Sequence, residues 1–215
     1  NNQLTALNVS KNTLLESLDC SSNQLTVLDV SVHIALRTLY CSSNQLSILD
    51  LSKNSSLRTL WCHENKLTIL NVFANGSRRF SFTDLKCYNN QLTSLDVSMG
   101  VGLTNLNCYN NQLMALDVSN SVNLIELNCS NNQLTSLNLK NGKNTSLTTK
   151  DFTNNPNLSC IQVDDPTYSD ANWIIAKDAA VSYNTDCYTF ILIPDVNFEK
   201  KLIFLGIDSG AVNEQ

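Results

Sequence analysis

The feature that most constrains this chain is a repeat of 21 residues that carries one cysteine per copy. The pattern Leu-x-x-Leu-x-Cys-x-x-Asn-x-Leu recurs, and successive in-phase cysteines are 21, 21, 25, 21 and 21 residues apart. These cysteines are Cys20, Cys41, Cys62, Cys87, Cys108 and Cys129. One coil of this length cannot bury its own leucines, whereas stacked coils share a continuous core. The sequence therefore predicts a solenoid of about seven copies over residues 1–160.

Each copy contains two short segments with the side-chain period of a β-strand. Leu and Cys alternate with other residues in the first half, and Leu28 and Val30 alternate with Asp29 in the second half of one copy. A period of two places alternate side chains on one face, so these segments should point Leu, Cys and Val inward. Stacked copies should then form two parallel sheets.

The combined pattern LxxLxCxxNxLxxLDVSxNxx resembles the conserved segment of leucine-rich repeats, with Cys in place of one Leu. It is most similar to the short 21-residue bacterial class called IRREKO, and the resemblance covers about residues 1–160. It implies a right-handed α/β solenoid, mostly β, with parallel strands, few helices and a C-terminal cap. It also implies a secreted or cell-surface bacterial protein, but it specifies no ligand.

One asparagine recurs three residues after each in-phase cysteine. The Asn amide offers two donors and an acceptor, which can satisfy backbone groups left unpaired at tight corners inside the coil. We therefore expect a structural ladder inside the solenoid rather than a catalytic set. Its members are Asn23, Asn44, Asn65, Asn90, Asn111 and Asn132.

The eight cysteines fall into two groups. The six in-phase cysteines occupy a core position and should be buried, reduced thiols. Cys160 and Cys187 flank residues 161–187, which we interpret as a C-terminal cap with a short helix capped by Ser169 or Asp170 and with Trp173 over the core. We expect a disulfide between them, which would indicate an oxidising compartment. The alternative is a pair of free thiols.

Two segments depart from the pattern. One copy is four residues longer than its neighbours, with an insertion near residues 73–82 that carries Arg78 and Arg79. We interpret it as a tolerated surface insertion, with a binding loop as the alternative. Residues 188–215 suggest a linker and the start of a following cap helix, from Asp195 to Gly206. We expect the chain to be an excerpt of a longer protein.

Several functional classes are disfavoured. The chain has a net charge of −5 with 14 Lys and Arg residues, which argues against nucleic-acid binding. It lacks an apolar stretch long enough for a membrane span. His33 and His63 belong to no hydrolase, zinc or phosphate-binding motif. Recurring aspartates such as Asp29 alternate with asparagine between copies, which favours backbone bonding over metal binding. We expect no enzyme activity, cofactor or metal.

Binding is better supported by the residues that flank the inward Leu and Cys. They form an aromatic stripe, with two arginines on the same copies: Tyr40, Trp61, His63, Tyr88, Tyr109, Arg37 and Arg58. Exposed Tyr, Trp and Arg in one patch are typical of binding hot spots, and flat aromatic rings also suit sugars. Cross-strand stacking that only stabilises the sheet is an equal alternative.

Three hypotheses for function follow. The first is an extracellular recognition or adhesion module that binds a protein or a glycan through the concave face. The second is a structural spacer in a longer surface protein. The third is ice or mineral binding through a column of hydroxyl residues, which Met114 interrupts. That column comprises Thr5, Thr26, Ser47, Thr68, Thr93 and Thr135.

Overall fold

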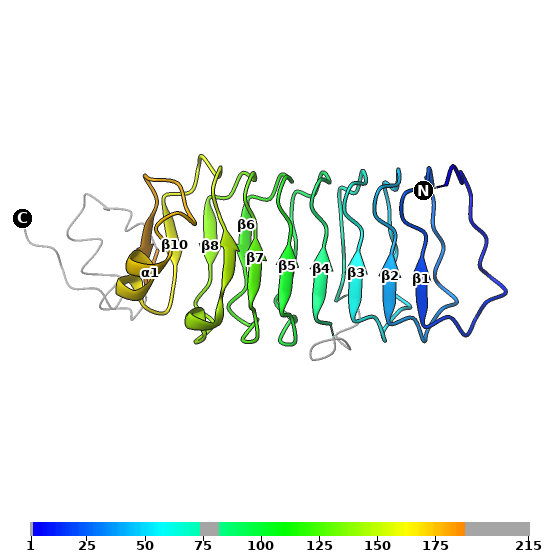
Figure 1. The fold of residues 1–215 in the computed structure, drawn as a ribbon, viewed down its shortest axis with the longest axis horizontal. Coiled ribbons are helices and arrows are strands. Elements are labelled where there is room, and N and C mark those ends of the chain that lie inside the picture. Colours follow the sequence, from blue (N-terminus) through cyan, green and yellow to red (C-terminus); the bar gives the residue numbers. More distant parts are fainter. Residues whose placement is uncertain (1, 74–81, 188–215) are drawn as a thin grey trace, which may run out of the picture.

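The computed structural model of the chain describes residues 2–73 and 82–187. Successive coils stack side by side along one axis, and Figure 1 shows one short strand of the first sheet in each coil. These strands form a seven-stranded sheet in the order β1-β2-β3-β4-β5-β7-β9. Their bounds are β1 Ser17–Asp19, β2 Thr38–Tyr40, β3 Thr59–Trp61, β4 Asp84–Lys86, β5 Asn105–Asn107, β7 Glu126–Asn128 and β9 Thr149–Asp151.

All strand pairs of this sheet are parallel and in the register of the repeat. Leu39 lies opposite Leu60, and Tyr40 lies opposite Trp61. The ladder continues past the strand, since the Cys41 N–H donates to the Trp61 carbonyl at 2.9 Å. The predicted parallel-strand solenoid is therefore confirmed.

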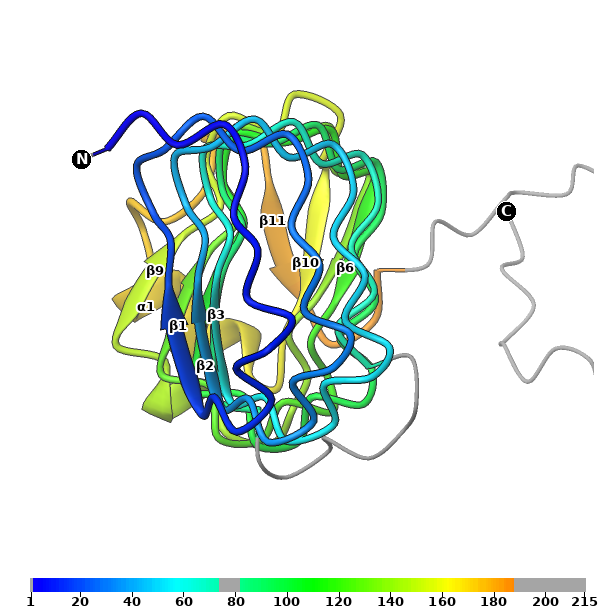
Figure 2. The ribbon, with the colours of Figure 1, turned by 90° about the vertical axis from the view of Figure 1, so that its right-hand side faces the viewer.

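A second, four-stranded parallel sheet lies on the opposite side of the coils (Figure 2). It comprises β6 (Ala115–Asp117), β8 (Ser136–Asn138), β10 (Cys160–Gln162) and β11 (Ser182–Asn184). We expected such a strand in every copy, and this was wrong for the first copies of the described chain. There residues 47–52 and 68–71 form no strands, and they line a hollow of about 430 Å³.

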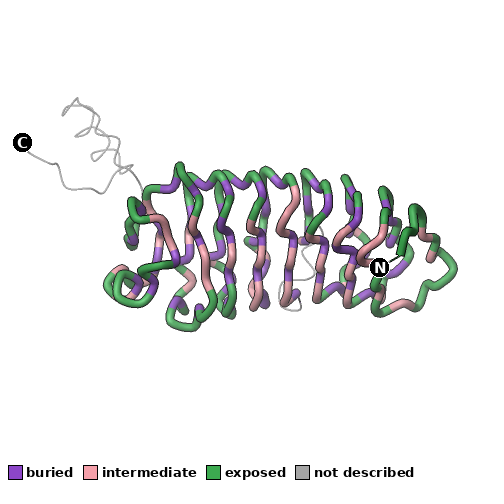
Figure 3. Tube along the Cα trace, turned by 45° about the horizontal axis from the view of Figure 1, so that its top comes forward, coloured by how far each residue is buried: buried purple, intermediate pink, exposed green. Residues whose placement is uncertain are grey.

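The core is a column of leucines and cysteines that repeats from coil to coil, as the burial pattern in Figure 3 shows. The side chains of Leu39, Cys41, Leu60 and Cys62 are all 0% exposed. The coils follow a nearly straight line in Figures 1 and 3.

The C-terminal end of the solenoid is covered by α1 (Pro166–Asn172) and by Trp173, which is 1% exposed. The N-cap is Asp165, so the prediction of Ser169 or Asp170 was wrong. The Asp165 carboxylate accepts from the N–H groups of Thr167 and Tyr168, and Pro166 follows at a position where no N–H is needed. One short 3₁₀ helix, η1 (Asn144–Ser146), precedes β9.

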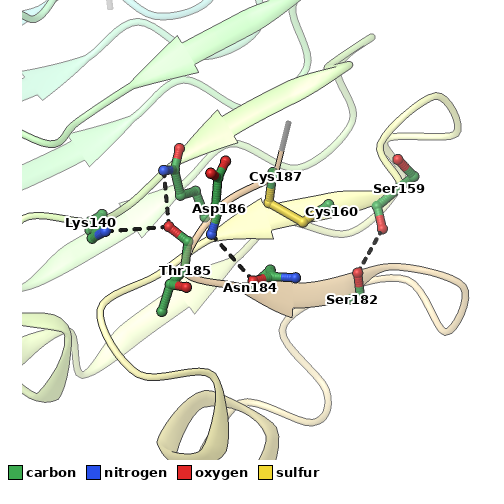
Figure 4. Close-up of a disulfide and its surroundings, with 9 residues drawn as sticks. Lys140, Ser159, Cys160, Ser182, Asn184, Thr185, Asp186 and Cys187 are labelled. Atoms are coloured by element: carbon green, nitrogen blue, oxygen red, sulfur yellow. Dashed lines mark hydrogen bonds between the residues drawn. A yellow bond between two sulfur atoms is a disulfide. The ribbon is translucent and has the colours of Figure 1, made fainter. Parts of the chain in front are cut away.

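A disulfide joins Cys160 in β10 to Cys187 beyond β11, as predicted, with 5.7 Å between the Cα atoms (Figure 4). Beside it, the Thr185 carbonyl accepts from Lys140 Nζ and Gln162 Nε2, which ties the chain after β11 to the sheet. The boundary that we expected between residues 160 and 161 falls inside β10. The second sheet therefore runs from the repeats into the cap without a break.

Two expectations lie outside the described residues. They are the insertion arginines Arg78 and Arg79, and the linker and cap helix within 188–215. At the base of the insertion, Phe73 packs edge-on against Phe82, with ring centroids 5.5 Å apart.

Candidate binding face

The recurring asparagines form a ladder of hydrogen bonds inside one corner of the solenoid. Asn44 Nδ2 donates to the carbonyls of Cys20, Cys41 and Ser42, and its Oδ1 accepts from the Leu25 N–H. The same set recurs at Asn65, Asn90, Asn111 and Asn132, and it extends to Asn155. Asn23, in the first of these coils, bonds within its own coil and to the Leu4 N–H. These side chains join coils and are sheltered from a ligand.

A second buried polar column, which the sequence analysis missed, lies at another corner. Asn54 Nδ2 donates to the carbonyls of Val30 and His33, and His33 Nε2 lies 3.1 Å from the Val9 carbonyl oxygen. Ser121 and Asn144 hold the equivalent places further along. The signal in the sequence was the second Asn of the repeat, such as Asn12 and Asn54, whose position His33 occupies in the copy between them. His33 is thus part of the scaffold.

The recurring aspartates act on the backbone. Oδ1 of Asp29, Asp50, Asp96 and Asp117 accepts from the N–H two residues later at 2.8–2.9 Å, as Asn8 and Asn138 do in their own coils. Hydrogen bonds from Ser31 hold the pKa of Asp29 below its usual value, and bonds from Ser52 and Ser98 lower the pKa values of Asp50 and Asp96 in the same way. Within the described residues, no group of three or more His, Cys, Asp or Glu side chains is placed to hold a metal.

The six in-phase cysteines are free thiols, and all six are buried. Burial raises the pKa of the Cys62 and Cys108 thiols to about 12 and that of Cys20 to about 11. Since the thiolate is the reactive form, these groups are chemically inert at neutral pH.

On the outer face of the seven-stranded sheet, Trp61 lies between neighbours from the coils on either side. Its ring centroid is 4.4 Å from that of Tyr40, and the Lys86 ammonium lies 3.7 Å from the Trp61 centroid. The register places Tyr40, Trp61 and Lys86 in one row, so the two contacts cover opposite faces of the indole. The indole N–H donates to Asp84 Oδ2 at 2.8 Å.

The second aromatic row lies two residues further along the same coils. His63 stacks on Tyr88 at 4.2 Å, and Tyr88 stacks on Tyr109 at 4.5 Å, with interplanar angles of 13° and 10°. Burial lowers the pKa of His63 and raises that of Tyr88, so both rings are neutral at pH 7. Both faces of Tyr88 are covered. The rows therefore present ring edges and phenol hydroxyls to solvent, while most ring faces are used within the protein.

Among the described residues, Arg37 and Arg58 make none of the stacking or cation–π contacts of these rows. Arg37 and Arg58 are exposed, and Arg37 Nε pairs with Glu16 Oε2 at 3.2 Å. A third outward column, which we did not predict, is formed by the residue that precedes each inward Leu. Asp84 belongs to it and orients the Trp61 ring. The signal was the alternation itself, because the residues on both sides of an inward Leu point outward.

The opposite side of the coils has a different character. The hydroxyl column from Thr26 to Thr135 is exposed, and the neighbouring column exposes Val27, Ile48 and Ile69 at 72%, 76% and 64%. The hollow between Ile48 and Ile69 interrupts this surface. The hydroxyl column is therefore bordered by this hollow at Ser47 and Thr68 and interrupted at Met114.

A parallel-strand solenoid with Leu and Cys inside and an asparagine ladder at the corner defines a leucine-rich repeat fold. The chain is a leucine-rich repeat protein with 21-residue, cysteine-variant repeats. No protein-family model matches the chain, and no curated protein matches it.

Two solved structures share the fold. The functional domain of InlJ from Listeria monocytogenes, which includes a cysteine ladder, matches 84% of this chain at 30% identity with a TM-score of 0.53. A leucine-rich repeat protein from Leptospira interrogans, LIC12759, matches 76% of this chain at 22% identity with a TM-score of 0.56. The matches cover 46% and 48% of those chains, so this chain spans about half of their length.

Among the described residues, no helix is long and apolar enough to cross a membrane. The fold and its neighbours support a repeat module of the kind that serves protein interaction.

Proposed function

We propose that this chain is a non-enzymatic, extracellular recognition module that binds a protein ligand across the outer face of the seven-stranded sheet. The observation that carries the proposal is the pair of aromatic rows on that face, Tyr40–Trp61 and His63–Tyr88–Tyr109. They are half-buried and already ordered by stacking, so little side-chain entropy is lost when a partner covers them. Ordered Tyr and Trp side chains are the usual anchors of protein interfaces.

A protein ligand fits these rows better than a glycan stacked on them. Sugars bind aromatic residues through ring faces, and here Trp61 and Tyr88 have both faces covered. Exposed ring edges and phenol hydroxyls instead suit the mixed apolar and hydrogen-bonding contacts of a protein surface. Arg37 and Arg58 lie at the margin of the face, where charge acts on association rate and salt dependence.

The Cys160–Cys187 disulfide supports an extracellular location, because such bonds persist in oxidising compartments. A bacterial cell surface is the setting that we propose. The insertion with Arg78 and Arg79 is a candidate for a secondary contact, acting mainly through salt-sensitive association.

The test is an array of surface proteins and glycans probed with the wild-type chain and two variants. Trp61→Ala removes a central anchor on the proposed face, and Ile69→Ala removes an exposed apolar side chain of the opposite side. Loss of one anchor typically costs about 2 kcal/mol, near thirtyfold in affinity. We expect Trp61→Ala to lose binding to a protein ligand and Ile69→Ala to retain it.

Other outcomes would contradict the proposal. Retained binding in Trp61→Ala with loss in Ile69→Ala would place the site on the opposite side. Binding to glycans alone would exclude a protein ligand. No ligand for the wild type would favour a structural spacer, for which the observation is that the rings already satisfy one another.

A further inference from the structure

A hollow of about 120 Å³ lies on the outer face of the seven-stranded sheet, beside the end of the aromatic rows. Its walls come from β4, β5, β7 and β9, which are consecutive in the sheet and of which Figure 1 labels the first three. The hollow is lined by the polar or charged side chains of Asp84, Lys86, Asn105, Asn107, Glu126 and Asn128.

Two oxygen atoms of residues that line this hollow have no hydrogen-bond partner among the described residues. They are Asp84 Oδ1 and Asn107 Oδ1, and both are almost wholly shielded from solvent. The other carboxylate oxygen of Asp84 is engaged by the Trp61 indole. A shielded acceptor without a donor is costly, so both atoms favour a ligand that brings donors. A sugar hydroxyl both donates and accepts, whereas a cationic side chain only donates.

The charge of the hollow agrees with a cationic ligand. Two carboxylates, Asp84 and Glu126, line it together with one ammonium, that of Lys86. The Lys86 ammonium is held over the Trp61 ring at 3.7 Å. The lining therefore carries a net negative charge, which attracts cations and disfavours anions.

The row of stacked aromatic rings ends at Tyr109, just past β5, a strand that also contributes to the hollow. Tyr88 covers one face of Tyr109, and the next coil places Ser130 on the other side, since the Asn110 N–H donates to the Ser130 carbonyl. Serine is small and carries no ring, so this is the exposed end of the aromatic row. A guanidinium group is flat, stacks on aromatic faces and presents a fork of donors that matches carboxylates.

We propose that this hollow receives the guanidinium of an arginine side chain presented by the protein ligand, an inference that rests on the proposed function. The guanidinium donates to Glu126 and to the acceptors Asp84 Oδ1 and Asn107 Oδ1. The hollow then serves as the specificity pocket at one end of the recognition face.

The test uses the intact chain and a small probe, so it needs no identified partner. N-acetylarginine amide is titrated while backbone amide resonances are followed, and N-acetylcitrulline amide serves as the neutral isostere. We expect saturable shifts at residues 105–109 and 126–130, with a dissociation constant of about millimolar order. Binding of the citrulline probe should be at least tenfold weaker.

Two variants with the same change of charge localise the site. Glu126→Gln should weaken arginine binding at least threefold, because Glu126 lines the hollow. Glu16 directly precedes β1, at the far end of the sheet from the hollow, so Glu16→Gln should leave binding unchanged. Both side chains are exposed, so both variants should fold.

Equal binding of the arginine and citrulline probes, shifts at other residues, or no shifts would overturn the proposal. Equal effects of the two Glu→Gln variants would overturn it as well. Shifts of the same resonances by methyl β-glucoside, with none by the arginine probe, would identify a saccharide site instead. If the arginine probe does not bind, the array can still show a protein ligand on the whole face. If the array shows no ligand, the titration can still show binding of the arginine probe. The two proposals therefore fail separately.

Discussion

At the scale of single residues, buried asparagine amides hold adjacent coils together through hydrogen bonds. From Asn44 onward, each ladder asparagine satisfies carbonyls in two adjacent coils and one N–H of the preceding coil. The column of leucines supplies burial, but the amides fix where one coil lies on the next. This role was predictable, because a residue type that recurs once per turn beside a core position must meet the same backbone groups in every coil.

We predict that Asn111→Ala destabilises the fold far more than Gln112→Ala. Asn111 is buried and donates to the carbonyls of Cys87, Cys108 and Tyr109, and its Oδ1 accepts from the Leu92 N–H. The substitution removes all four bonds and leaves the Leu92 N–H without its acceptor. The expected loss is about 1–3 kcal/mol. Gln112 is exposed and should cost little.

The measurement is urea denaturation of both variants followed by circular dichroism. Equal midpoints would show that the ladder contributes nothing to stability. Asn89→Ala, next to the ladder residue Asn90, would be a poorer control. The φ of Asn89 is 52°, in the left-handed region that asparagine tolerates better than alanine.

We predict that the triple substitution Asp29→Asn, Asp50→Asn and Asp96→Asn flattens the acid dependence of stability. The folded-state pKa values of these carboxyls are lowered by bonds from serine, so their contribution is present above the ordinary Asp pKa of about 4 and is lost as pH falls through the folded values. Asparagine makes the equivalent backbone bond at Asn8 and Asn138 and does not titrate.

The comparison is urea denaturation of the wild type and of the triple variant at pH 6 and at pH 3. The wild type should lose more stability between the two values than the variant does. An equal loss in both proteins would mean that these turns do not contribute to acid sensitivity.

At the scale of elements, the strands around the in-phase cysteines follow from the sequence, and those of the second half-copy follow only in part. Leu-x-Cys alternation gives a strand in every complete coil of the described chain. The similar Leu-x-Val alternation pairs only from β6 onward, next to the cap strands β10 and β11 that continue the sheet. Pairing depends on the spacing of neighbouring coils, which a local pattern does not encode. The start of α1 was predictable from Asp165 and Pro166, a capping residue followed by proline.

We predict that the disulfide stabilises the cap. Cys160→Ala combined with Cys187→Ala opens a loop with a sequence separation of 27 residues, for which about 3–4 kcal/mol is expected. Trp173 reports on the cap because it is buried against Phe152, Tyr168 and Tyr183.

The experiment is done in a Trp61→Phe background, so that Trp173 is the remaining tryptophan. Its fluorescence should change at lower urea concentration in the double variant than in the disulfide-bonded protein, with the repeats unfolding later. Unchanged midpoints would mean that the cap is held by packing alone.

At the scale of the whole molecule, the solenoid separates structure from recognition. Its interior is closed by leucine, thiol and amide columns, and the outer face of one sheet carries the ordered aromatic rows. The positions of those rings were predictable, because the repeat spacing shows which residues occupy the same outward position in successive coils. The repeat could not show that the rings face one another rather than solvent, that Asp84 holds Trp61, or that a hollow follows Tyr109, because these depend on distances between side chains of adjacent coils.

The central claim is that ligands bind the outer face of the seven-stranded sheet, and the most direct test is hydrogen exchange of the chain with and without a protein ligand taken from the array. We expect slower exchange in peptides that cover residues 38–45, 59–66, 84–91 and 105–112. We expect no change in those that cover residues 26–30 and 47–52. Protection confined to the latter segments, or protection of neither set at saturating ligand, would contradict this claim.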